Sequence, residues 1–304
     1  MNPESILVVA NPTSRHMPKR EKLLEQLQPL IDEGHRVELV STAAPGDAVG
    51  IAQEASRAGF TRIAACGGDG TLNEVINGVG GDGPVVGVLP AGTGNVWAKE
   101  VGISWNIGKA ARLLVEGPVR RVDLGVANER KFLLMCSGGL DGAVTARVSM
   151  KMKRRLGSTA YVLRGLKMLP GYTPLTSQFE LDGETLESTY YIFVVGNSRS
   201  YGGAVNITRR AFVDDGLLDV CMIGGDSLTR LARHALRVVL KTHPSAHDIL
   251  YRRVRSFKLE QAGIPLQIDG EAFGESPLTI GVAPAAVRMV IPDNPSIFAH
   301  PPLV

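Results

Sequence analysis

A glycine-rich stretch with a single acid is the first candidate for chemistry. It reads Gly67-Gly68-Asp69-Gly70-Thr71-Leu72-Asn73 and follows the apolar run at 63–65. A strand, a glycine turn and a helix start form an anion site, because glycine admits a phosphate close to the backbone and the first helical amides point at it. We expect the helix to begin at Thr71. Asp69 would repel a phosphate, which favours a divalent cation between them, and the alternative is a tight turn in which Asp69 caps the helix.

Two further loops follow apolar runs in the same part of the chain. The run at 85–89 ends in Pro90-Ala91-Gly92-Thr93-Gly94-Asn95, and the run at 6–10 ends in Asn11-Pro12-Thr13-Ser14-Arg15. In a doubly wound sheet, ligands bind outside the carboxyl ends of the strands, so these loops should face one crevice. Neither glycine loop matches Gly-x-Gly-x-x-Gly or Gly-x-x-x-x-Gly-Lys-Ser/Thr. The pattern predicts a nucleotide site and disfavours both a dinucleotide dehydrogenase and a Walker-type ATPase.

The elements around these loops alternate between strands and helices. Apolar runs at 6–10, 37–40, 63–65 and 85–89 read as buried strands, and 19–33 and 47–58 have helical spacing. This alternation predicts a doubly wound α/β domain over 1–120, with a parallel sheet covered on both faces. Residues 293–304 are a candidate completion of that domain.

From about Arg121 the pattern changes to short strands separated by turns. Strand-like runs occupy 122–127, 132–135, 178–181, 190–195, 217–223, 265–268, 278–282 and 287–291. They predict an all-β domain over 121–292, a sandwich or a barrel, interrupted by two helical insertions. The tripeptide Asp-Gly-Glu occurs twice there, at 182–184 and 269–271, and both copies suit a hairpin turn.

The charge is concentrated in the two insertions. The net charge is only +3, but 142–179 and 227–259 contain seven and eight Lys or Arg and a single acid, Asp248. In the first of them, basic and apolar side chains alternate, which suits an anionic membrane surface; a solvated helix over the protein core is the alternative. Nucleic acid is disfavoured, because aromatics make up 5% of the chain and no RNA-binding aromatic motif or zinc-finger spacing is present.

Cysteine usage and hydropathy limit the compartment. Cys66, Cys136 and Cys221 are far apart and odd in number, so they form neither a disulfide framework nor a Cys-x-x-Cys metal site. No stretch approaches about 18 uninterrupted apolar residues, and no basic leader precedes the first apolar run. We expect a reducing, cytoplasmic location with peripheral membrane contact, without a signal peptide or a membrane span.

Five motifs in order resemble the diacylglycerol kinase catalytic-domain family of lipid kinases, which includes bacterial diacylglycerol kinases and sphingosine kinases. Three are the loops at 11–15, 67–73 and 92–95; the others are Val213-Asp214-Asp215-Gly216-Leu217-Leu218-Asp219 and Ile268-Asp269-Gly270-Glu271. The loop at 67–73 alone is shared with NAD kinases and phosphofructokinases. The resemblance covers nearly the whole chain and implies an NAD kinase/phosphofructokinase-like nucleotide domain followed by a β-sandwich.

The resemblance implies that the cofactors are ATP and Mg²⁺. ATP would contact Asn11, Pro12, Thr13, Ser14, Arg15, Thr42, Gly67, Gly68, Asp69, Gly70, Thr71, Leu72, Asn73 and Thr93. Asp69 would reach the magnesium directly or through water, with Asp123 supporting that network. A second, structural magnesium would lie on Asp215 and the carbonyls of Phe212 and Leu217. The second loop continues Asn95-Val96-Trp97 where bacterial diacylglycerol kinases often have Asn-Asp-Phe, so one acid of the metal network is missing.

The resemblance places the catalytic residues in the second Asp-Gly-Glu. By resemblance, Asp269 and Glu271 form the acid pair that takes the proton from the lipid hydroxyl as it attacks the γ-phosphorus. The first copy, at 182–184, is interpreted as a plain hairpin turn. Which of Asp269 and Glu271 is the base stays open.

Two other functions are alternatives to a lipid kinase. An NAD kinase is one, because Gly157-Ser158-Thr159-Ala160-Tyr161 matches a string of that family, although here it follows a basic stretch. A non-catalytic nucleotide or lipid sensor is the other, and the presence of Asp69, Asp269 and Glu271 argues against it. By this resemblance, we expect an ATP-dependent lipid kinase for diacylglycerol or a related lipid. Its expected partners are the lipid substrate and an anionic membrane, with a homodimer left open.

Overall fold

A computed structural model of the chain describes residues 3–148, 167–168, 171–203, 205–224, 231, 233–234, 237, 249–293 and 296–299. The chain divides into two compact units. The first contains Met1–Asp123 and Pro284–Val304, and the second is Leu124–Ala283. Two long strands, β5 (Val119–Ala127) and β17 (Leu278–Val290), contribute residues to both units.

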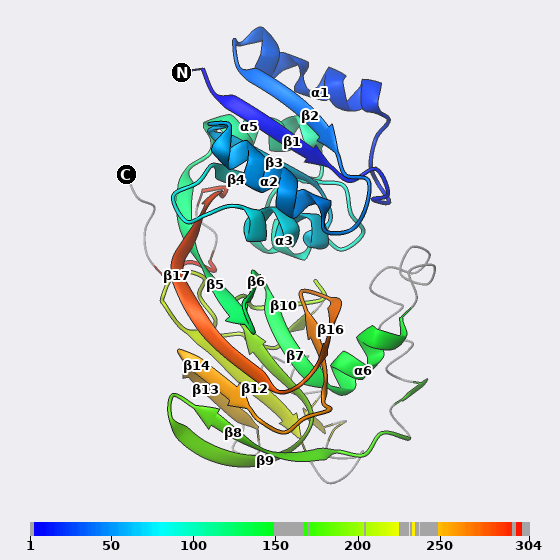
Figure 1. Ribbon diagram of the computed structural model, residues 1–304, viewed down its shortest axis with the longest axis vertical. Coiled ribbons are helices and arrows are strands. Elements are labelled where there is room, and N and C mark those ends of the chain that lie inside the picture. Colours follow the sequence, from blue (N-terminus) through cyan, green and yellow to red (C-terminus); the bar gives the residue numbers. More distant parts are fainter. Residues whose placement is uncertain are drawn as a thin grey trace. The chain divides into compact units, whose positions relative to one another are not determined.

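The first unit contains a parallel sheet in the order β4-β3-β1-β2 (Figure 1). Its strands are β1 (Ser5–Ala10), β2 (Arg36–Ser41), β3 (Arg62–Gly67) and β4 (Val85–Pro90). The three inner strands are almost completely buried, as expected for a parallel sheet with both faces covered. β17 continues the sheet beyond β4, where Met289 pairs with Val86 in parallel register.

Among the described residues, five helices accompany this sheet. They are α1 (Arg20–Asp32), α2 (Asp47–Arg57), α3 (Asp69–Gly78), α4 (Val96–Val101) and α5 (Ile107–Glu116). α1 packs against α5, and α2 packs against α3. Since β1 to β2 and β2 to β3 cross the sheet in opposite directions, right-handed connections place α1 and α2 on opposite faces. The arrangement is the doubly wound α/β fold that the alternation predicts.

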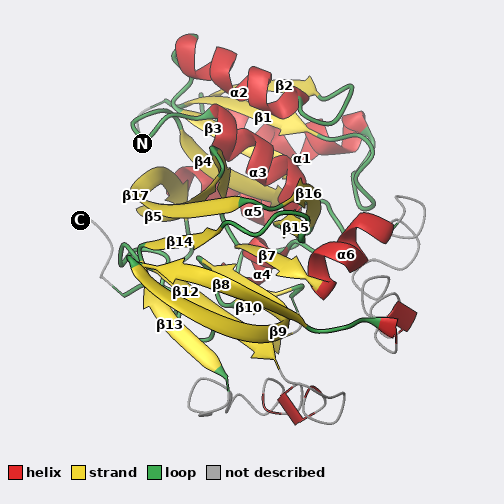
Figure 2. Ribbon diagram, turned by 60° about the horizontal axis from the view of Figure 1, so that its bottom comes forward, coloured by secondary structure: helices red, strands yellow, loops and turns green. Residues whose placement is uncertain are grey.

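The second unit is a two-layer β structure in which strands predominate (Figure 2). One layer runs β13-β12-β9-β7-β15-β16, and the other runs β9-β8-β14-β17-β5-β6. The remaining elements are β6 (Arg130–Phe132), β7 (Met135–Gly139), α6 (Leu140–Arg147), β8 (Leu175–Leu181), β9 (Glu184–Gly196), β10 (Ser200–Tyr201), β11 (Val205–Asn206), β12 (Leu218–Gly224), β13 (Leu250–Val254), β14 (Ser256–Leu259), β15 (Pro265–Ile268) and β16 (Glu271–Glu275). The 13-residue β9 belongs to both layers, because its first half pairs with β8 and its second half with β7 and β12.

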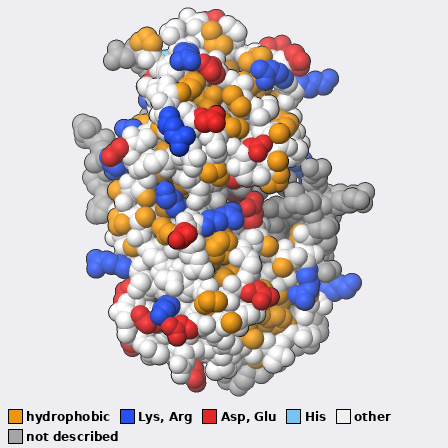
Figure 3. Space-filling model, in the orientation of Figure 1, with side chains coloured by type: hydrophobic (Ala, Val, Ile, Leu, Met, Phe, Trp, Pro, Cys, Tyr) orange, Lys and Arg blue, Asp and Glu red, His pale blue; other side chains and the backbone are white. Residues whose placement is uncertain are grey.

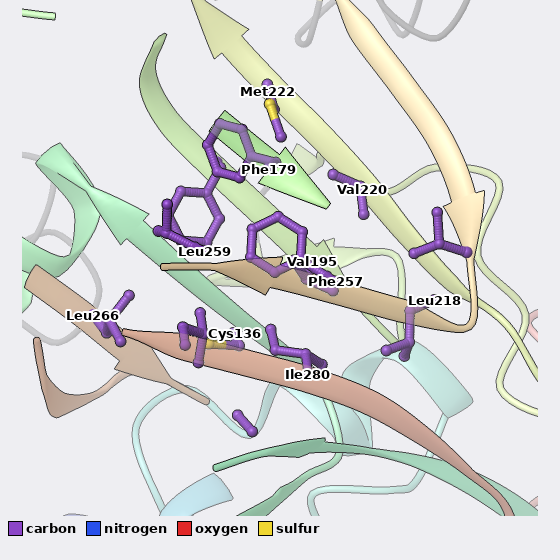
Figure 4. Packing of buried hydrophobic residues seen from close by; sticks show 14 of the residues in the cluster. Cys136, Phe179, Val195, Leu218, Val220, Met222, Phe257, Leu259, Leu266 and Ile280 are labelled. Carbon is purple, nitrogen blue, oxygen red and sulfur yellow. The ribbon is translucent and has the colours of Figure 1, made fainter. Parts of the chain in front are cut away.

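The core of the second unit lies between these two layers (Figure 4). Val195, Val220 and Leu266 come from one layer, and Phe257 and Ile280 come from the other. The aromatic rings are in direct contact: the Phe193 and Phe257 centroids are 5.2 Å apart. Alternate residues of each strand supply this core, which makes the unit the β-sandwich that the sequence predicts.

Several predicted boundaries are wrong. The run at 132–135 is not one strand, because β6 ends at Phe132 and β7 begins at Met135. The runs at 278–282 and 287–291 belong to one continuous strand, β17. Residues 250–259, assigned to a basic helical insertion, form β13 and β14, because Tyr251, Val254 and Phe257 turn inward while the arginines point outward. Tertiary pairing overrides the helical charge pattern here.

The basic segments that we expect to bind membranes fall largely outside the described residues. This applies to 149–166 and to most of 225–248, and also to the string at 157–161 that resembles NAD kinases. On the face shown in Figure 3, acidic and basic side chains are interspersed rather than separated by sign. No helix in the described part of the chain has the length and apolar composition needed to cross a bilayer.

The three cysteines are free and buried. Burial raises the pKa of Cys66 and of Cys221 to about 12, and it also raises the pKa of Cys136. Thiols of this kind remain protonated near neutral pH and act as small apolar side chains. They therefore serve packing rather than nucleophilic chemistry.

Candidate functional site

Backbone hydrogen bonds tie together the carboxyl ends of the strands in the first unit. The Asn11 N–H donates to the Cys66 carbonyl at 2.9 Å, and the Thr42 N–H donates to the Ala10 carbonyl at 2.9 Å. The carbonyl of Gly67 accepts from both Ala91 and Gly92, at 2.9 and 3.0 Å. The residues predicted to bind ATP at 11–15, 42, 67–73 and 93 therefore lie along one edge of the sheet.

The two glycine loops are in contact with each other. A Cβ on Gly92 would overlap the Cα of Gly68, and a Cβ on Gly68 would lie 3.4 Å from the Cα of Gly92. Gly92 is therefore required by close approach of two backbones rather than by a positive φ. Asn95 closes the second loop, because its Oδ1 accepts from the Gly92 N–H at 3.1 Å.

Asp69 is the first residue of α3 and faces the second loop. Its Oδ1 accepts the Trp97 N–H at 3.1 Å, and its Oδ2 lies 3.2 Å from where a Cβ of Gly94 would be. The N-cap position of α3 is Gly68, and Asp69 is the first residue within the helix. The alternative in which Asp69 caps the helix is therefore wrong, and the helix begins two residues before the predicted Thr71.

Asn11 connects the first loop to α3. Its Nδ2 donates to Thr71 Oγ1 at 3.2 Å, and its Oδ1 accepts from the backbone and hydroxyl of Thr13 at 3.0 and 2.8 Å. Pro12, Thr13 and Arg15 are exposed and Ser14 is half-buried, so these residues can meet a ligand. Leu72 and Asn73 are 2% exposed, which leaves mainly their backbones to do so.

Asp123 is buried on β5, at 3% exposure. Its Oδ1 accepts the Ala285 N–H at 2.6 Å, which attaches this carboxylate to β17. Ala285 has a φ of +51°, a left-handed conformation that a non-glycine residue rarely adopts. This contact gives Asp123 a part in joining the two long strands.

The second Asp-Gly-Glu forms the turn between β15 and β16. Asp269 and Gly270 have φ of +48° and +82°, the combination of a tight two-residue hairpin. The Asp269 carboxylate accepts three backbone amides: Leu133 N–H on Oδ2 at 3.0 Å, and Leu134 and Met135 N–H on Oδ1 at 2.9 Å each. This carboxylate is therefore fixed by the start of β7.

Glu271 begins β16 and forms an ion pair in the same unit. Its Oε2 lies 2.9 Å from the Arg130 guanidinium, and the two side chains are 38% and 31% exposed. Asp269 and Glu271 thus differ in environment: the first is held by main-chain amides and the second by a side chain with access to water. Arg130 belongs to none of the five motifs, so it could not be recognised from the sequence.

The carboxylate assigned to a second magnesium already has a cationic neighbour. Asp215 pairs with Arg253, and its Oδ1 accepts the Leu217 N–H at 3.0 Å. Nearby Asp219 is 1% exposed, and burial raises its pKa to about 6, against a hydrogen bond from Tyr251 and the charge of Arg253. Within the described ranges, no three His, Cys, Asp or Glu side chains gather as metal ligands. A magnesium on Asp215, Phe212 and Leu217 stays a prediction.

Comparison with known proteins identifies the class. The diacylglycerol kinase catalytic domain matches residues 5–127, and the YegS C-terminal NAD kinase beta sandwich-like domain matches residues 135–291. The chain belongs to the diacylglycerol kinase-like family of lipid kinases and is a kinase-type enzyme.

Individual relatives support this assignment over nearly the full length. A diacylglycerol kinase of Bacillus subtilis (strain 168) is 32% identical over 274 residues, covering 89% of this chain and 90% of its own. Lipid kinase YegS of Escherichia coli (strain K12) is 30% identical over 300 residues, covering 96% and 97%. A crystal structure of a diacylglycerol kinase from Bacillus anthracis str. Sterne shares the fold, with a TM-score of 0.74 at 21% identity over 97% of this chain and 98% of that one.

Proposed function

We propose that this enzyme transfers the γ-phosphate of Mg-ATP to the hydroxyl of diacylglycerol or a related lipid. The observation that carries the proposal is the contact between the two glycine loops at the ends of β3 and β4. Two glycine backbones side by side, next to the N-terminus of a ten-residue helix, suit a polyphosphate. A kinase family implies ATP as the phosphate donor.

In this proposal, residues of the first unit bind and orient the nucleotide. The leading amides of α3 would donate to phosphate oxygens, and Asn11 would hold Thr71 in place through its 3.2 Å hydrogen bond. The Asp69 carboxylate suits a hard divalent cation, since magnesium prefers oxygen ligands. When bound, magnesium neutralises charge on the phosphates.

The second unit supplies the acid pair for the acceptor hydroxyl. Asp269, fixed by three amides, and Glu271, held by Arg130, would take the hydroxyl proton and orient the oxygen for attack on phosphorus. We further propose that the enzyme is cytoplasmic and peripheral, reaching its lipid at an anionic membrane surface through the basic segments at 142–179 and 227–259.

The choice of lipid follows from the relatives. The Bacillus subtilis relative is named a diacylglycerol kinase, whereas the Escherichia coli relative is named only a lipid kinase. Diacylglycerol is therefore the first substrate to test, followed by sphingoid bases, glycerophospholipids and polyprenols.

The test is transfer of labelled γ-phosphate by the purified full-length protein. Vesicles containing each lipid and, in parallel, NAD would be offered with Mg-ATP. We expect label in an organic-extractable product, lost in Asp69→Ala and kept in Asp182→Asn, a variant of the exposed hairpin. Label in NADP would establish the NAD kinase alternative. Tight ATP binding without transfer to any acceptor would favour the sensor.

A further inference from the structure

A small group of polar side chains is buried beneath the Asp-Gly-Glu turn at 269–271. Ser137 on β7, Asp141 on α6 and Gln267 on β15 are 0%, 6% and 3% exposed. They lie in one unit, on the face of β7 and β15 that is covered by α6, because the alternate residues Cys136, Leu266 and Ile268 point into the apolar core. Burying an amide and a carboxylate is costly unless both are hydrogen-bonded, so their partners indicate what the group does.

Gln267 bridges this group to the turn. Its Oε1 accepts the backbone N–H of Gly270 at 2.7 Å. Its Nε2 donates to Ser137 Oγ at 2.6 Å and to Asp141 Oδ2 at 3.1 Å. The Gly270 amide can only donate and an ionised carboxylate can only accept, so the orientation of the Gln267 amide is fixed from both sides.

Asp141 is the anchor of the bridge. Besides Gln267, the hydroxyls of Ser137 and Tyr201 donate to its carboxylate. Burial raises the pKa of Asp141, and these three hydrogen bonds oppose the rise by stabilising the ionised form. The Asp141 carboxylate thus accepts from residues of β7, β10 and β15. It keeps the amide nitrogen of Gln267 turned toward Asp141 and the amide oxygen turned toward Gly270.

We propose that Gln267, anchored by Asp141, is a positioning residue that orients the Asp-Gly-Glu turn for phosphoryl transfer. The inference rests on the proposed function, in which that turn holds the acid pair. The amides of residues 133–135 hold the Asp269 carboxylate, and the side chain of Gln267 holds the backbone N–H of Gly270. Together, these contacts hold the turn in a single orientation. Two acids that act on one hydroxyl require such a fixed position.

The hairpin at 182–184 lacks this support. The residue two positions before Asp182 is Glu180, which is exposed, whereas the residue two positions before Asp269 is the buried Gln267. A hairpin with positive φ at Asp and Gly therefore does not need a glutamine to form. This difference indicates that Gln267 serves the orientation of the second turn rather than its existence.

The first test compares Gln267→Leu with Ser177→Ala in full-length enzyme, at temperatures where both are folded. Ser177 is a matched control, because its hydroxyl hydrogen-bonds Tyr190 at 3.0 Å, buried in the same unit, away from the turn. We expect Gln267→Leu to lower kcat for the lipid by about tenfold to a hundredfold with KM for ATP nearly unchanged, while Ser177→Ala keeps kcat. A lower melting temperature with unchanged kcat would overturn the proposal.

Gln267→Glu gives a readout that a purely structural role would not move. Its carboxylate can still accept from Gly270, but it repels Asp141 unless the two acids share a proton. The ratio of its kcat to that of the wild type should therefore rise as the pH falls. The other titratable or charged groups near this network are common to both proteins: Cys136, Arg147, Tyr201, Asp269, Glu271, Glu275 and Arg130. A ratio that does not change with pH would contradict the bridge.

Amide exchange separates this inference from the proposed function. We expect the Gly270 N–H to exchange faster in Gln267→Leu than in the wild type, with the amides of 182–184 unchanged. A wild-type protein that phosphorylates no lipid would refute the proposed function, and the Gly270 exchange rate would still decide whether Gln267 orders the turn. If Gln267→Leu does not fold, the near-isosteric Gln267→Glu supplies both measurements.

Discussion

The hairpins at 182–184 and 269–271 share a tripeptide and a local structure. In both, Asp and Gly have positive φ. The Asp N–H donates to a neighbouring strand, to Ser256 at 3.2 Å or Met135 at 3.0 Å, and the carboxylate accepts amides at the start of that strand. In both copies, the Asp of the tripeptide therefore attaches the turn to a neighbouring strand through the same kind of backbone hydrogen bonds.

Their surroundings separate them. Asp182 and Glu184 are exposed, whereas Asp269 is half-buried, Glu271 pairs with Arg130 and Gly270 is held by Gln267. The tripeptide accounts for the turn, and the residues behind it account for any chemistry. Substitutions made in matched pairs at the two turns can separate these contributions.

The largest difference is expected between Asp269→Asn and Asp182→Asn. We expect the first to lower kcat for lipid phosphorylation by about a hundredfold to ten-thousandfold, the range for loss of a general base, and the second to leave kcat unchanged. Steady-state kinetics with diacylglycerol vesicles measures both. Equal losses of kcat in the two variants would show that the hydrogen bonds of the Asp carboxylate matter only for folding.

Glu271→Gln and Glu184→Gln sharpen the assignment of the base. We expect Glu271→Gln to lower kcat by about tenfold to a hundredfold, because it removes one acid of the pair and the ion pair with Arg130. Glu184→Gln is the control and should behave as wild type. A larger loss in Glu271→Gln than in Asp269→Asn would make Glu271 the base.

Stability should separate the turns less than activity does. Asp269→Asn loses charged hydrogen bonds to three partly buried amides, and we expect the free energy of unfolding to fall by about 2–3 kcal/mol. Asp182→Asn loses similar bonds at an exposed site, for which about 1 kcal/mol is expected. Urea unfolding measures both, and a greater loss in Asp182→Asn would reverse the comparison.

The buried anchor beneath the second turn should give stability a pH dependence. Burial raises the pKa of Asp141 in the folded state, so the folded protein binds a proton more tightly than the unfolded chain. This group's contribution therefore falls as the pH rises from about 3.9 through its folded pKa. Over that pH window, the free energy of unfolding of the wild type should fall relative to that of Asp141→Asn. The difference between the wild type and Ser177→Ala should stay constant. Parallel curves for all three proteins would contradict this expectation.

The smallest effect is expected for Arg130→Gln on stability. The Arg130–Glu271 pair is about one-third exposed, and pairs of this kind contribute less than about 1 kcal/mol. The thermal midpoint should hardly move, while KM or kcat for the lipid changes. A large fall in the midpoint would assign the pair to folding.

The fold was predictable from the sequence to a useful extent. The strands at 6–10, 63–65 and 85–89 and the turn at 182–184 follow from local patterns, and the structure confirms them. The two-layer β unit and the family are confirmed as well. Local sequence patterns were sufficient to predict elements whose structure depends on residues nearby in the sequence.

The sequence could not supply contacts between distant segments. Asp269 meets Leu133, which lies 136 residues earlier, and Gln267 meets Asp141, 126 residues earlier. Gln267 left one trace, a polar residue within the apolar run at 265–268, but its partners depend on the pairing of β15 with β7. The break between β6 and β7 has the same origin, because the amides of Leu133 and Leu134 donate to Asp269 instead of continuing a strand.

The strand shared by both layers has a consequence for folding. β9 pairs with β8 through residues 184–190, with β12 through residues 190–196 and with β7 through residues 192–196. Neither layer can unpair fully without removing a strand from the other and exposing the aromatic cluster around Phe193. The β unit should therefore lose its structure in one cooperative transition, with β9 as its least separable part.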